Sequence, residues 1–350
     1  MKKKVAWLGL DCHRRQCTLA HMDEEGQLVS CRSVPTEQQA LVEAIQGVPA
    51  QSKNLMLEQC EVSRWIARVI RPHVQTLVVC DPRENHLLSR HHNKRDDRDA
   101  LTLARLLRLG EYKAVWQPLE ANRIAFRHAA GSYEDAVRHQ TRLKLQIKGE
   151  YRQWGVMVSG SEVFHADKKQ RFLGQLPPQA RRPLELFYEL LDAALKVESL
   201  ARRHLSDLGR EFPEIARLKT VPGVGRIGAS LFVAYVQDPR RFSRDSQLHR
   251  YCRLGIRETS SDGKPLGFQR LDAAGHGSLK AISYRAWLTA QRRRQGPVWE
   301  FYRQSLERTG STVHARLNTQ RKVLSTLWRL WIHQEEFDPQ RFLSASPPAV

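Results

Sequence analysis

The sequence predicts a mixed α/β domain at the N-terminal end and a mainly helical chain after it. Over the first 112 residues, short apolar runs typical of strands alternate with segments of helical periodicity. From about Glu111 the strand-like runs disappear, and long arginine-rich segments with helical spacing replace them. A chain of 350 residues is also long enough for two or three domains, each with its own core.

The N-terminal elements follow the order β-β-β-α-β-α-β-α. The predicted strands cover residues 5–11, 16–21, 27–33, 54–58 and 75–80. The predicted helices cover residues 36–46, with Thr36 as N-cap, residues 62–70, and a segment that begins near Asp96. This is the order found in ribonuclease-H-like nucleases, so we expect a sheet with helices packed on it.

Four carboxylates stand where such a fold would bring them together. Asp11 and Glu58 each end a predicted strand, and Asp96 and Asp99 share one face of a helix because they are three residues apart. Taken alone, each has a simpler explanation, namely helix capping or a turn at the end of a strand. Together they would repel one another unless two divalent cations about 4 Å apart neutralised them. Magnesium suits such hard oxygen ligands.

Two long helices are predicted between residues 113 and 217, paired as an antiparallel coiled coil. Their apolar stripes are Ala136, Leu143, Ile147, Tyr151 and Trp154 in the first helix, and Phe187, Leu190, Leu191, Ala194, Val197 and Ala201 in the second. Residues 155–183 contain several glycines and prolines and predict a loop with a short helix. The pair is equally compatible with a spacer, a dimer arm and a nucleic-acid contact.

A mostly helical C-terminal domain is predicted over residues 218–342. Pro222-Gly223-Val224-Gly225, followed by small residues, is the signature of a helix–hairpin–helix motif, in which backbone amides face a phosphate. An ordinary tight turn between helices is the alternative. Trp328 and Trp331 are three residues apart and favour a place in the core over base stacking.

An exposed polar loop is predicted ahead of the last helices. It contains Ser260-Ser261-Asp262-Gly263, a sequence that on its own usually forms only a turn. Residues 247–254 before it and residues 278–342 after it predict helices, and residues 343–350 predict a frayed tail.

The charge of the chain points to a polyanionic partner. The chain has 57 Lys and Arg against 37 Asp and Glu, which gives a formal net charge of +20 and favours nucleic acid. No stretch approaches the roughly 20 apolar residues of a membrane span, and the apolar run at residues 5–10 is too short for a signal peptide. We therefore expect a cytoplasmic protein with no membrane partner. The six cysteines form no C-x-x-C pair and are expected to be buried reduced thiols.

These motifs, in this order, resemble the insertion sequence 110 family of DEDD transposases, which is similar to the Piv DNA invertase. The N-terminal part of the resemblance consists of Asp11, Leu57-Glu58, Asp81-Pro82 and Lys94-x-Asp96-x-x-Asp99-Ala100. The C-terminal part consists of Pro222-Gly223-Val224-Gly225, Arg241-Phe242, Gln247-Leu248 and Ser260-Ser261-x-Gly263-Lys264. The resemblance covers nearly the whole chain, and the ordered set is more specific than any one motif.

The resemblance implies a RuvC-like domain over residues 1–112, whose Asp11, Glu58, Asp96 and Asp99 hold Mg²⁺. It implies a coiled-coil region over residues 113–217 and a transposase C-terminal domain over residues 218–342, with a serine that attacks the DNA backbone. We expect Ser261 to be this nucleophile, with Ser260 as the alternative.

The family also implies partners. These are double-stranded DNA at the element ends and at the target, a structured guide RNA, and further copies of the chain in a dimer or tetramer. In such an oligomer the acidic site of one subunit meets the serine of another. We therefore predict a magnesium-dependent, RNA-guided DNA transposase in the bacterial cytoplasm, associated with the nucleoid.

Two other functions are compatible with parts of the sequence. A RuvC-type junction nuclease would cut DNA without a covalent adduct and would not need either serine. A non-enzymatic basic scaffold would bind RNA or DNA and would tolerate loss of the carboxylates. The ordered acidic set argues against the scaffold, and the C-terminal resemblance favours the transposase over the nuclease.

Overall fold

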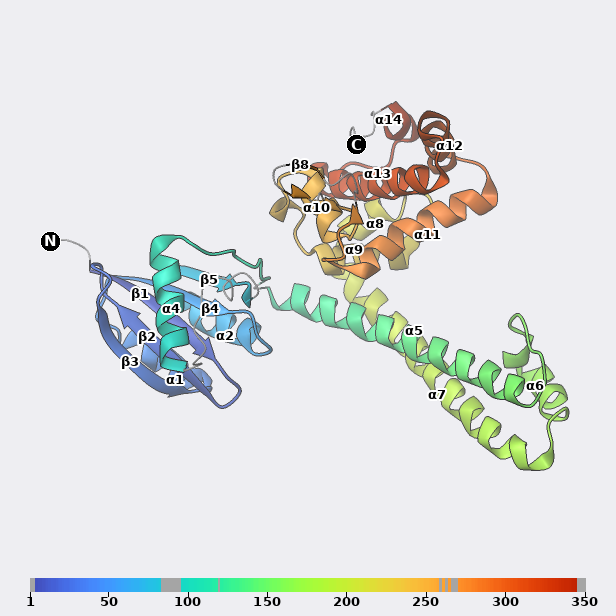
Figure 1. The fold of residues 1–350 in the computed structure, drawn as a ribbon, viewed down its shortest axis with the longest axis horizontal. Helices are drawn as coiled ribbons and strands as arrows, with labels where there is room; N and C mark the ends of the chain where they lie inside the picture. Colours follow the sequence, from blue (N-terminus) through green and yellow to red (C-terminus); the bar gives the residue numbers. More distant parts are fainter. Residues whose placement is uncertain are drawn as a thin grey trace. The chain divides into compact units, whose positions relative to one another are not determined.

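The computed structural model describes residues 4–82, 96–118, 120–257, 260–261, 264–265 and 270–344, with only the backbone at residues 260, 261, 264 and 265. The chain forms two compact units, residues 1–120 and 121–350 (Figure 1). The finer division at residues 112, 217 and 342 stays a prediction. Lys94, Asp262, Gly263 and most of the predicted tail lie outside the described residues.

The first unit is built on a five-stranded mixed sheet. Its strands, in the spatial order β3-β2-β1-β4-β5, are β3 (Leu28–Pro35), β2 (Gln16–Met22), β1 (Val5–Cys12), β4 (Ser52–Glu58) and β5 (Thr76–Cys80). Strands β1, β2 and β3 form an antiparallel meander, whereas β4 runs parallel to both β1 and β5. All five strands and their mixed α/β setting are therefore as the sequence predicts.

Helices cover both faces of this sheet. Leu8 and Leu10 of β1 share a core with α1 (Gln38–Gln46) and α2 (Ser63–Ile70), which is followed by η1 (Arg71–His73). On the other face, Trp7 of β1 and Met56 of β4 pack with α4 (Asp96–Leu109), which crosses the sheet in Figure 1. Alternate residues of one strand thus contribute to two different cores, as the period of two along a strand requires.

Thr36 does not cap α1 as predicted. The N-cap residue is Glu37, and it makes no side-chain capping hydrogen bond. The Thr36 hydroxyl instead donates to the backbone carbonyl of His13 at 2.8 Å, and the Thr36 amide donates to that of Arg15 at 3.0 Å. Thr36 therefore fixes the turn between β1 and β2.

The second unit begins with the expected helical pair. The long helices α5 (Ala121–Gln153) and α7 (Pro178–Leu208) run side by side in Figure 1, and η2 (Glu162–Phe164) and α6 (Ala166–Leu173) lie at the far end. Helix α7 begins five residues before Pro183, which was predicted to belong to the loop. Trp154, predicted to continue the stripe of α5, lies beyond the end of that helix and is 48% exposed.

The predicted stripe of α7 is partly wrong. Leu190 and Val197 are both 55% exposed, whereas Leu184, Tyr188 and Leu191 are buried. The Tyr188 hydroxyl donates to the Val163 carbonyl at 2.7 Å and so joins α7 to η2 at the far end of the helical pair. Since Leu191 belongs to the predicted stripe, the stripe through which α7 packs on α5 coincides in part with the predicted one.

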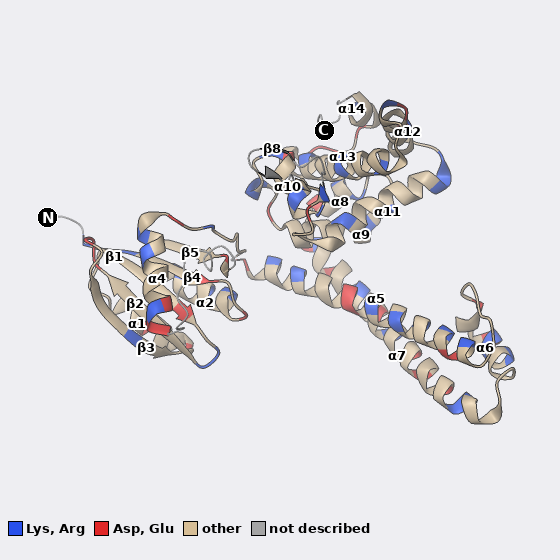
Figure 2. Cartoon of the chain, in the orientation of Figure 1, with Lys and Arg blue, Asp and Glu red and all other residues tan. Residues whose placement is uncertain are grey.

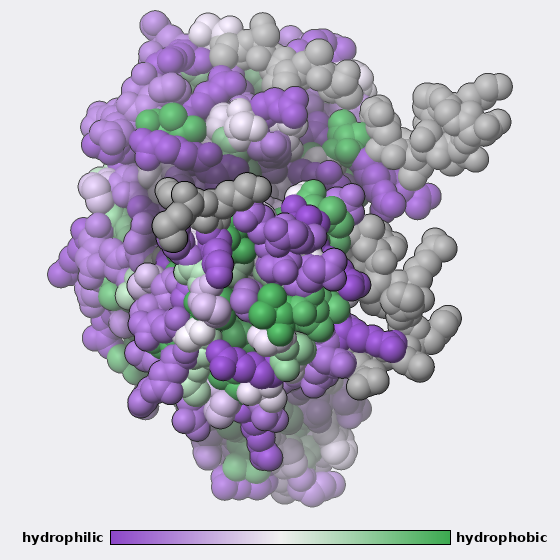
Figure 3. Space-filling view, turned by 90° about the vertical axis from the view of Figure 1, so that its left-hand side faces the viewer, coloured by the Kyte–Doolittle hydropathy of each residue, from purple (hydrophilic) through white to green (hydrophobic). Residues whose placement is uncertain are grey.

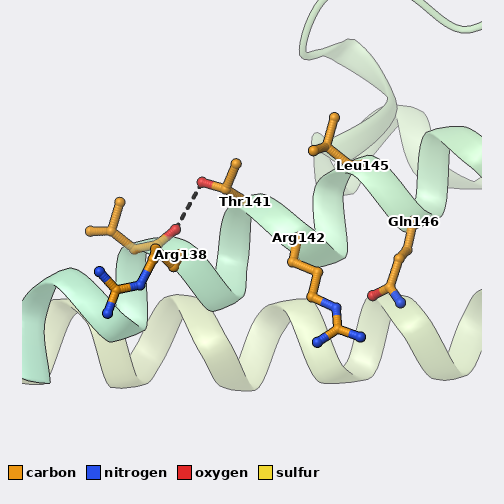
Figure 4. A pocket seen from close by; sticks show the side chains of 6 residues that line it. Arg138, Thr141, Arg142, Leu145 and Gln146 are labelled. Carbon is orange, nitrogen blue, oxygen red and sulfur yellow. Dashed lines mark hydrogen bonds between the residues drawn. The ribbon is translucent and has the colours of Figure 1, made fainter. Parts of the chain in front are cut away.

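An open groove with a volume of about 550 Å³ runs along α5. Its lining residues are Val137, Arg138, Thr141, Arg142, Leu145 and Gln146. Figure 4 shows Leu145 pointing away from α7, while Arg142 and Gln146 extend toward α7. The Thr141 hydroxyl donates to the carbonyl of Val137, one turn earlier, at 2.8 Å. The groove therefore combines basic and apolar side chains on the outer surface of the helical pair.

The remainder of the second unit is mostly helical, as predicted. Its elements are η3 (Gly209–Glu211), α8 (Glu214–Leu218), α9 (Gly225–Val236), η4 (Pro239–Arg241), α10 (Asp245–Tyr251), α11 (Gly277–Arg293), α12 (Pro297–Thr309), α13 (Thr312–His333) and α14 (Pro339–Ser344). Trp328 and Trp331 of α13 belong to the core, as predicted. The indole nitrogen of Trp328 donates to the Pro239 carbonyl at 2.7 Å. Phe126 and Leu205, from the base of the helical pair, belong to this same core.

Gly223 allows the turn between α8 and α9 to pack closely. Its φ is +82°, and an added Cβ atom would lie 2.7 Å from Cα of Ala286 in α11. Gly225, which opens α9, has a φ of +64° but has open space around its Cα. The two glycines thus serve a turn that packs against α11.

Charged and apolar residues are distributed as expected for a large basic protein. Figure 2 shows Lys and Arg along α5, α11 and α13, and a group of acidic residues at the N-terminal end of α4. On the face drawn in Figure 3, hydrophilic residues predominate, and apolar residues form small separate patches. In the described part of the chain, no helix has both the length and the apolar character needed to cross a membrane.

Candidate active site

Two of the predicted carboxylates end neighbouring parallel strands. Leu10 of β1 pairs with Leu57 of β4, so that Asp11 and Glu58 follow at the same edge of the sheet. Because residues alternate between faces, Asp11 lies on the same face as Trp7, and Glu58 on the same face as Met56. That face is the one covered by α4.

Gly9 lets α4 lie directly on β1. A Cβ atom at Gly9 would be 1.9 Å from the carbonyl oxygen of Ala100 and 2.6 Å from the amide nitrogen of Ala104. Both alanines are fully buried. This close approach brings the first turn of α4, which contains Asp96 and Asp99, to the edge where Asp11 lies. The acidic residues there also suit the positive end of the helix dipole.

The side chain of His13 lies between two of these carboxylates. Its Nε2 atom is 3.2 Å from Oδ2 of Asp11 and 3.7 Å from Oδ1 of Asp96. The three atoms lie within 4.8 Å of one another, which is a spacing suitable for metal ligands. Glu58 and Asp99 are not part of this tighter group. Sequence reasoning missed His13, although its position two residues after Asp11 was a visible signal.

The electrostatics of Asp11 are unfavourable without a cation. Burial raises the pKa of its carboxyl group, the negative charges of Asp96 and Asp99 raise the pKa further, and His13 opposes them. Its Oδ2 atom is buried, and Nε2 of His13 lies 3.2 Å from it. A buried carboxylate oxygen beside a second carboxylate and an imidazole fits the donor set of a divalent cation.

Three cysteines are grouped next to this site. Cys12 pairs with Cys17 across the β1–β2 hairpin, and the Cys12 thiol donates to the Leu10 carbonyl at 3.5 Å. Interaction with the Cys12 side chain is the main cause that lowers the pKa of Cys17 and of Cys60 to about 6. All six cysteines are free thiols, but the prediction that all are buried is wrong, because Cys31 is exposed on β3 and Cys60 is half-buried.

The two candidate serines form one side of a small hairpin. Strand β7 (Ser260–Ser261) pairs antiparallel with β8 (Lys264–Pro265), and Ser261 is opposite Lys264. The backbone register leaves two residues for the connecting loop, and these lie outside the described residues. A second short pair, β6 (Ile256–Arg257) with β9 (Arg270–Leu271), flanks the segment.

Comparison with known proteins identifies the family. A model of DEDD transposases of the IS110 type matches residues 8–152, and a model described as transposase IS116/IS110/IS902 family matches residues 215–303. The chain belongs to the IS110 family of transposases. The transposase for insertion sequence element IS1111A of Coxiella burnetii is 23% identical over 271 residues, which are 75% of this chain and 71% of that protein. An IS110-family transposase binds DNA and cuts and rejoins it, so the predicted reaction class and DNA partner are confirmed.

Each matched segment of this transposase contains part of the predicted chemistry. Asp11, Glu58, Asp96 and Asp99 fall in the first segment, and Ser260 and Ser261 fall in the second. The acidic residues belong to the first compact unit and the serines to the second.

Proposed function

We propose that this transposase cuts and rejoins insertion-sequence DNA with a magnesium-binding acidic site, Asp11, Glu58, Asp96 and Asp99, and a serine nucleophile, Ser261. The observation that carries the proposal is the approach of Asp11 from β1 and Asp96 from α4 to within ligand distance of one imidazole. When bound, Mg²⁺ would neutralise negative charge on a DNA phosphate and activate an oxygen nucleophile.

The sheet supports a ribonuclease-H-like, RuvC-like character for residues 1–112. An antiparallel meander on one side of β1 and parallel strands on the other is the arrangement expected from that fold. In this arrangement Asp11 and Glu58 supply carboxylates from the sheet edge, and Asp96 and Asp99 supply carboxylates from α4. Carboxylates on rigid strands and on a packed helix are held in fixed positions, which a site for in-line phosphate chemistry requires.

The serine step conserves the total number of phosphoester bonds, because one bond within DNA is exchanged for one between DNA and serine. The hydroxyl oxygen of Ser261 would bond to a backbone phosphorus while the bond from that phosphorus to the leaving sugar oxygen breaks. The proton of the serine hydroxyl ends on the leaving oxygen. Attack by another DNA strand end reverses the step, rejoins DNA and restores the serine. The pairing of β7 with β8 supports this assignment, because it places Ser261 at the end of a short hairpin strand, opposite Lys264.

The charge of the chain supports nucleic-acid partners beyond a single duplex. A net charge of +20 suits simultaneous contact with DNA and with an element-encoded guide RNA at the nucleoid. The exposed apolar residues of α7, among them Leu186, Leu190, Val197 and Leu200, support assembly of the chain into a dimer or tetramer through the region 113–217. Backbone amides at the turn that contains Gly223 would contact phosphate, as in a helix–hairpin–helix motif, in the domain of residues 218–342.

The decisive experiment traps a covalent intermediate. The full-length protein, purified with its co-purifying RNA, is incubated with end-labelled element DNA and Mg²⁺, and the products are separated on a denaturing gel. We expect a protein–DNA adduct that Ser261→Ala abolishes and Ser260→Ala retains. The reverse result would move the nucleophile to Ser260. Cut DNA without an adduct, insensitive to both substitutions, would instead indicate a junction nuclease.

The acidic site is tested in the same assay. We expect Asp11→Asn and Asp96→Asn to abolish strand exchange while circular dichroism shows the fold intact. Asp23→Asn, in the exposed β2–β3 turn, is the matched control and should keep full activity. Full recombination by Asp96→Asn would rule out the proposed acidic site.

A further inference from the structure

We propose that His13 ligates the cation bound by Asp11 and Asp96, so that this acidic site prefers Mn²⁺ to Mg²⁺. The inference rests on the proposed acidic site and adds a nitrogen donor to it.

The distances around His13 are those of neighbouring ligands on one ion. Nε2 is 3.2 Å from Oδ2 of Asp11 and 3.7 Å from Oδ1 of Asp96. Adjacent ligands of an octahedral ion with bonds of about 2.1 Å are about 3 Å apart. Both distances from Nε2 are therefore close to the spacing that two ligands of one bound ion require.

His13 is the neighbour that offsets the burial of Asp11. Its Nε2 atom lies 3.2 Å from the buried Oδ2 atom, and this interaction lowers the pKa of the Asp11 carboxyl group against the effect of burial. With its proton on Nδ1, a neutral imidazole carries a lone pair on Nε2. A cation bound between this lone pair and Oδ2 of Asp11 would take the place of a proton shared by the two atoms.

The backbone holds His13 at this position. The His13 carbonyl accepts a hydrogen bond from the Thr36 hydroxyl at 2.8 Å, and the Arg15 carbonyl accepts one from the Thr36 amide at 3.0 Å. These bonds fix the turn at His13 itself and two residues after it. The His13 side chain is nevertheless 49% exposed, so an ion can reach Nε2 from solvent.

An imidazole ligand changes which dication the site prefers. Mg²⁺ favours oxygen ligands and gives up its water reluctantly, whereas first-row transition ions bind imidazole more strongly. Mn²⁺ accepts carboxylates as readily as Mg²⁺ does and also accepts nitrogen. A hydrogen bond from His13 to a bound carboxylate would instead change the affinities for both ions by the same factor.

The test measures metal binding to the full-length protein without DNA. Mn²⁺ binding is followed by the electron paramagnetic resonance of the free ion, and Mg²⁺ binding by competition with Mn²⁺. We expect pulsed resonance spectra of the Mn²⁺ complex to show coupling to one imidazole nitrogen. We expect His13→Gln to remove that coupling and to lower the ratio of Mn²⁺ to Mg²⁺ affinity about tenfold or more.

His139→Gln, on the exposed surface of α5, is the matched control and should bind both ions as the wild type does. Asp11→Asn should weaken the binding of both ions, which tests the proposed acidic site separately. If Asp11→Asn has no effect, the acidic site itself is wrong. If Asp11→Asn weakens both ions but the wild-type spectrum lacks nitrogen coupling, or if His13→Gln changes both affinities equally, only the role of His13 is refuted.

Discussion

The close contact between Gly9 and α4 makes Gly9→Ala the sharpest test of how this site is built. The substitution adds a single methyl group to a strand that keeps its pairing with Ala20 of β2 and Met56 of β4. The new Cβ atom would lie 1.9 Å from the carbonyl oxygen of Ala100. Since that obstacle is helix backbone rather than a flexible side chain, α4 itself must move.

The required movement exceeds what the site can tolerate. To bring the Cβ-to-oxygen distance from 1.9 Å to an ordinary contact of 3.4 Å, α4 must shift by about 1.5 Å. Metal-binding groups must be held to within about 0.5 Å, so Asp96 should no longer reach the ion with Asp11. Overpacking of this kind costs about 1–3 kcal/mol, and replacing a strand glycine returns about 0.5–1 kcal/mol of it. We expect a net loss of roughly 1 kcal/mol and a Tm lower by roughly 5 °C.

Two measurements on one protein preparation test this reasoning. Thermal unfolding by circular dichroism reports the loss of stability, and titration with Mn²⁺ should show a loss of affinity of tenfold or more. Gly131→Ala in the interior of α5 is the control, because an added Cβ there meets nothing within 4 Å. It should stabilise the helix by up to about 1 kcal/mol and leave metal binding unchanged. A Gly9→Ala protein with wild-type affinity would show that close packing of α4 on β1 does not position the carboxylates.

Three further predictions concern stability. His249 is buried, its Nε2 lies 2.9 Å from the Ser325 hydroxyl, and burial lowers its pKa from 6.5 to about 4. Between these two pH values the unfolded chain binds a proton that the folded chain does not, so urea denaturation should show the second unit losing up to roughly 3 kcal/mol of stability as the pH falls from about 6.5 to 4. The variant His249→Gln should flatten that pH dependence. Gly223→Ala combines a positive φ with a 2.7 Å clash against Ala286 and should lower the folding stability by about 2–4 kcal/mol. Gly225→Ala, with open space around the added Cβ, should lower it by only about 1–2 kcal/mol, and equal losses of stability would mean that the clash has no effect. Asp11→Asn should raise the Tm of the metal-free protein above that of the wild type, because it removes a charge disfavoured by burial and by Asp96 and Asp99; a lower Tm would contradict that account.

The sheet could be predicted from sequence because its signals are local. Short apolar runs identified all five strands, and their order along the chain indicated the mixed α/β class. The position of Asp11 next to Glu58 followed from the same pattern, since both end apolar strands that run parallel. The fold class led us to expect the helix that begins near Asp96 to lie over the ends of these strands. Its backbone contact with Gly9 could not be predicted, because nothing in the pattern around Gly9 says which backbone it will contact.

The errors occur where a residue has more than one possible partner. Helix α7 carries apolar residues on several faces, so its pattern does not say whether Leu190 or Leu191 faces α5. Thr36 has the chemistry of an N-cap, but its hydroxyl bonds to the carbonyl of His13 in a turn 23 residues earlier. That non-local bond is also why His13 was missed, since the place of the imidazole depends on a turn fixed by another segment.

The same features that assemble the site also weaken it in the absence of a cation. Because Gly9 has no side chain, α4 can approach β1 closely, but a glycine in a strand packs less and loses more conformational entropy on folding than a larger residue does. The close approach also brings Asp96 and Asp99 toward the buried Asp11. A cation held by Asp11 and Asp96, as proposed, would reverse the sign of that interaction. Cation binding and the docking of α4 on β1 would then be thermodynamically linked, and each would strengthen the other by the same factor. A substitution that loosens the packing of α4, even far from the carboxylates, should therefore weaken metal binding. The cation should also protect the backbone amides of α4 from hydrogen exchange more than it protects those of β3, the edge strand farthest from β4 and β5.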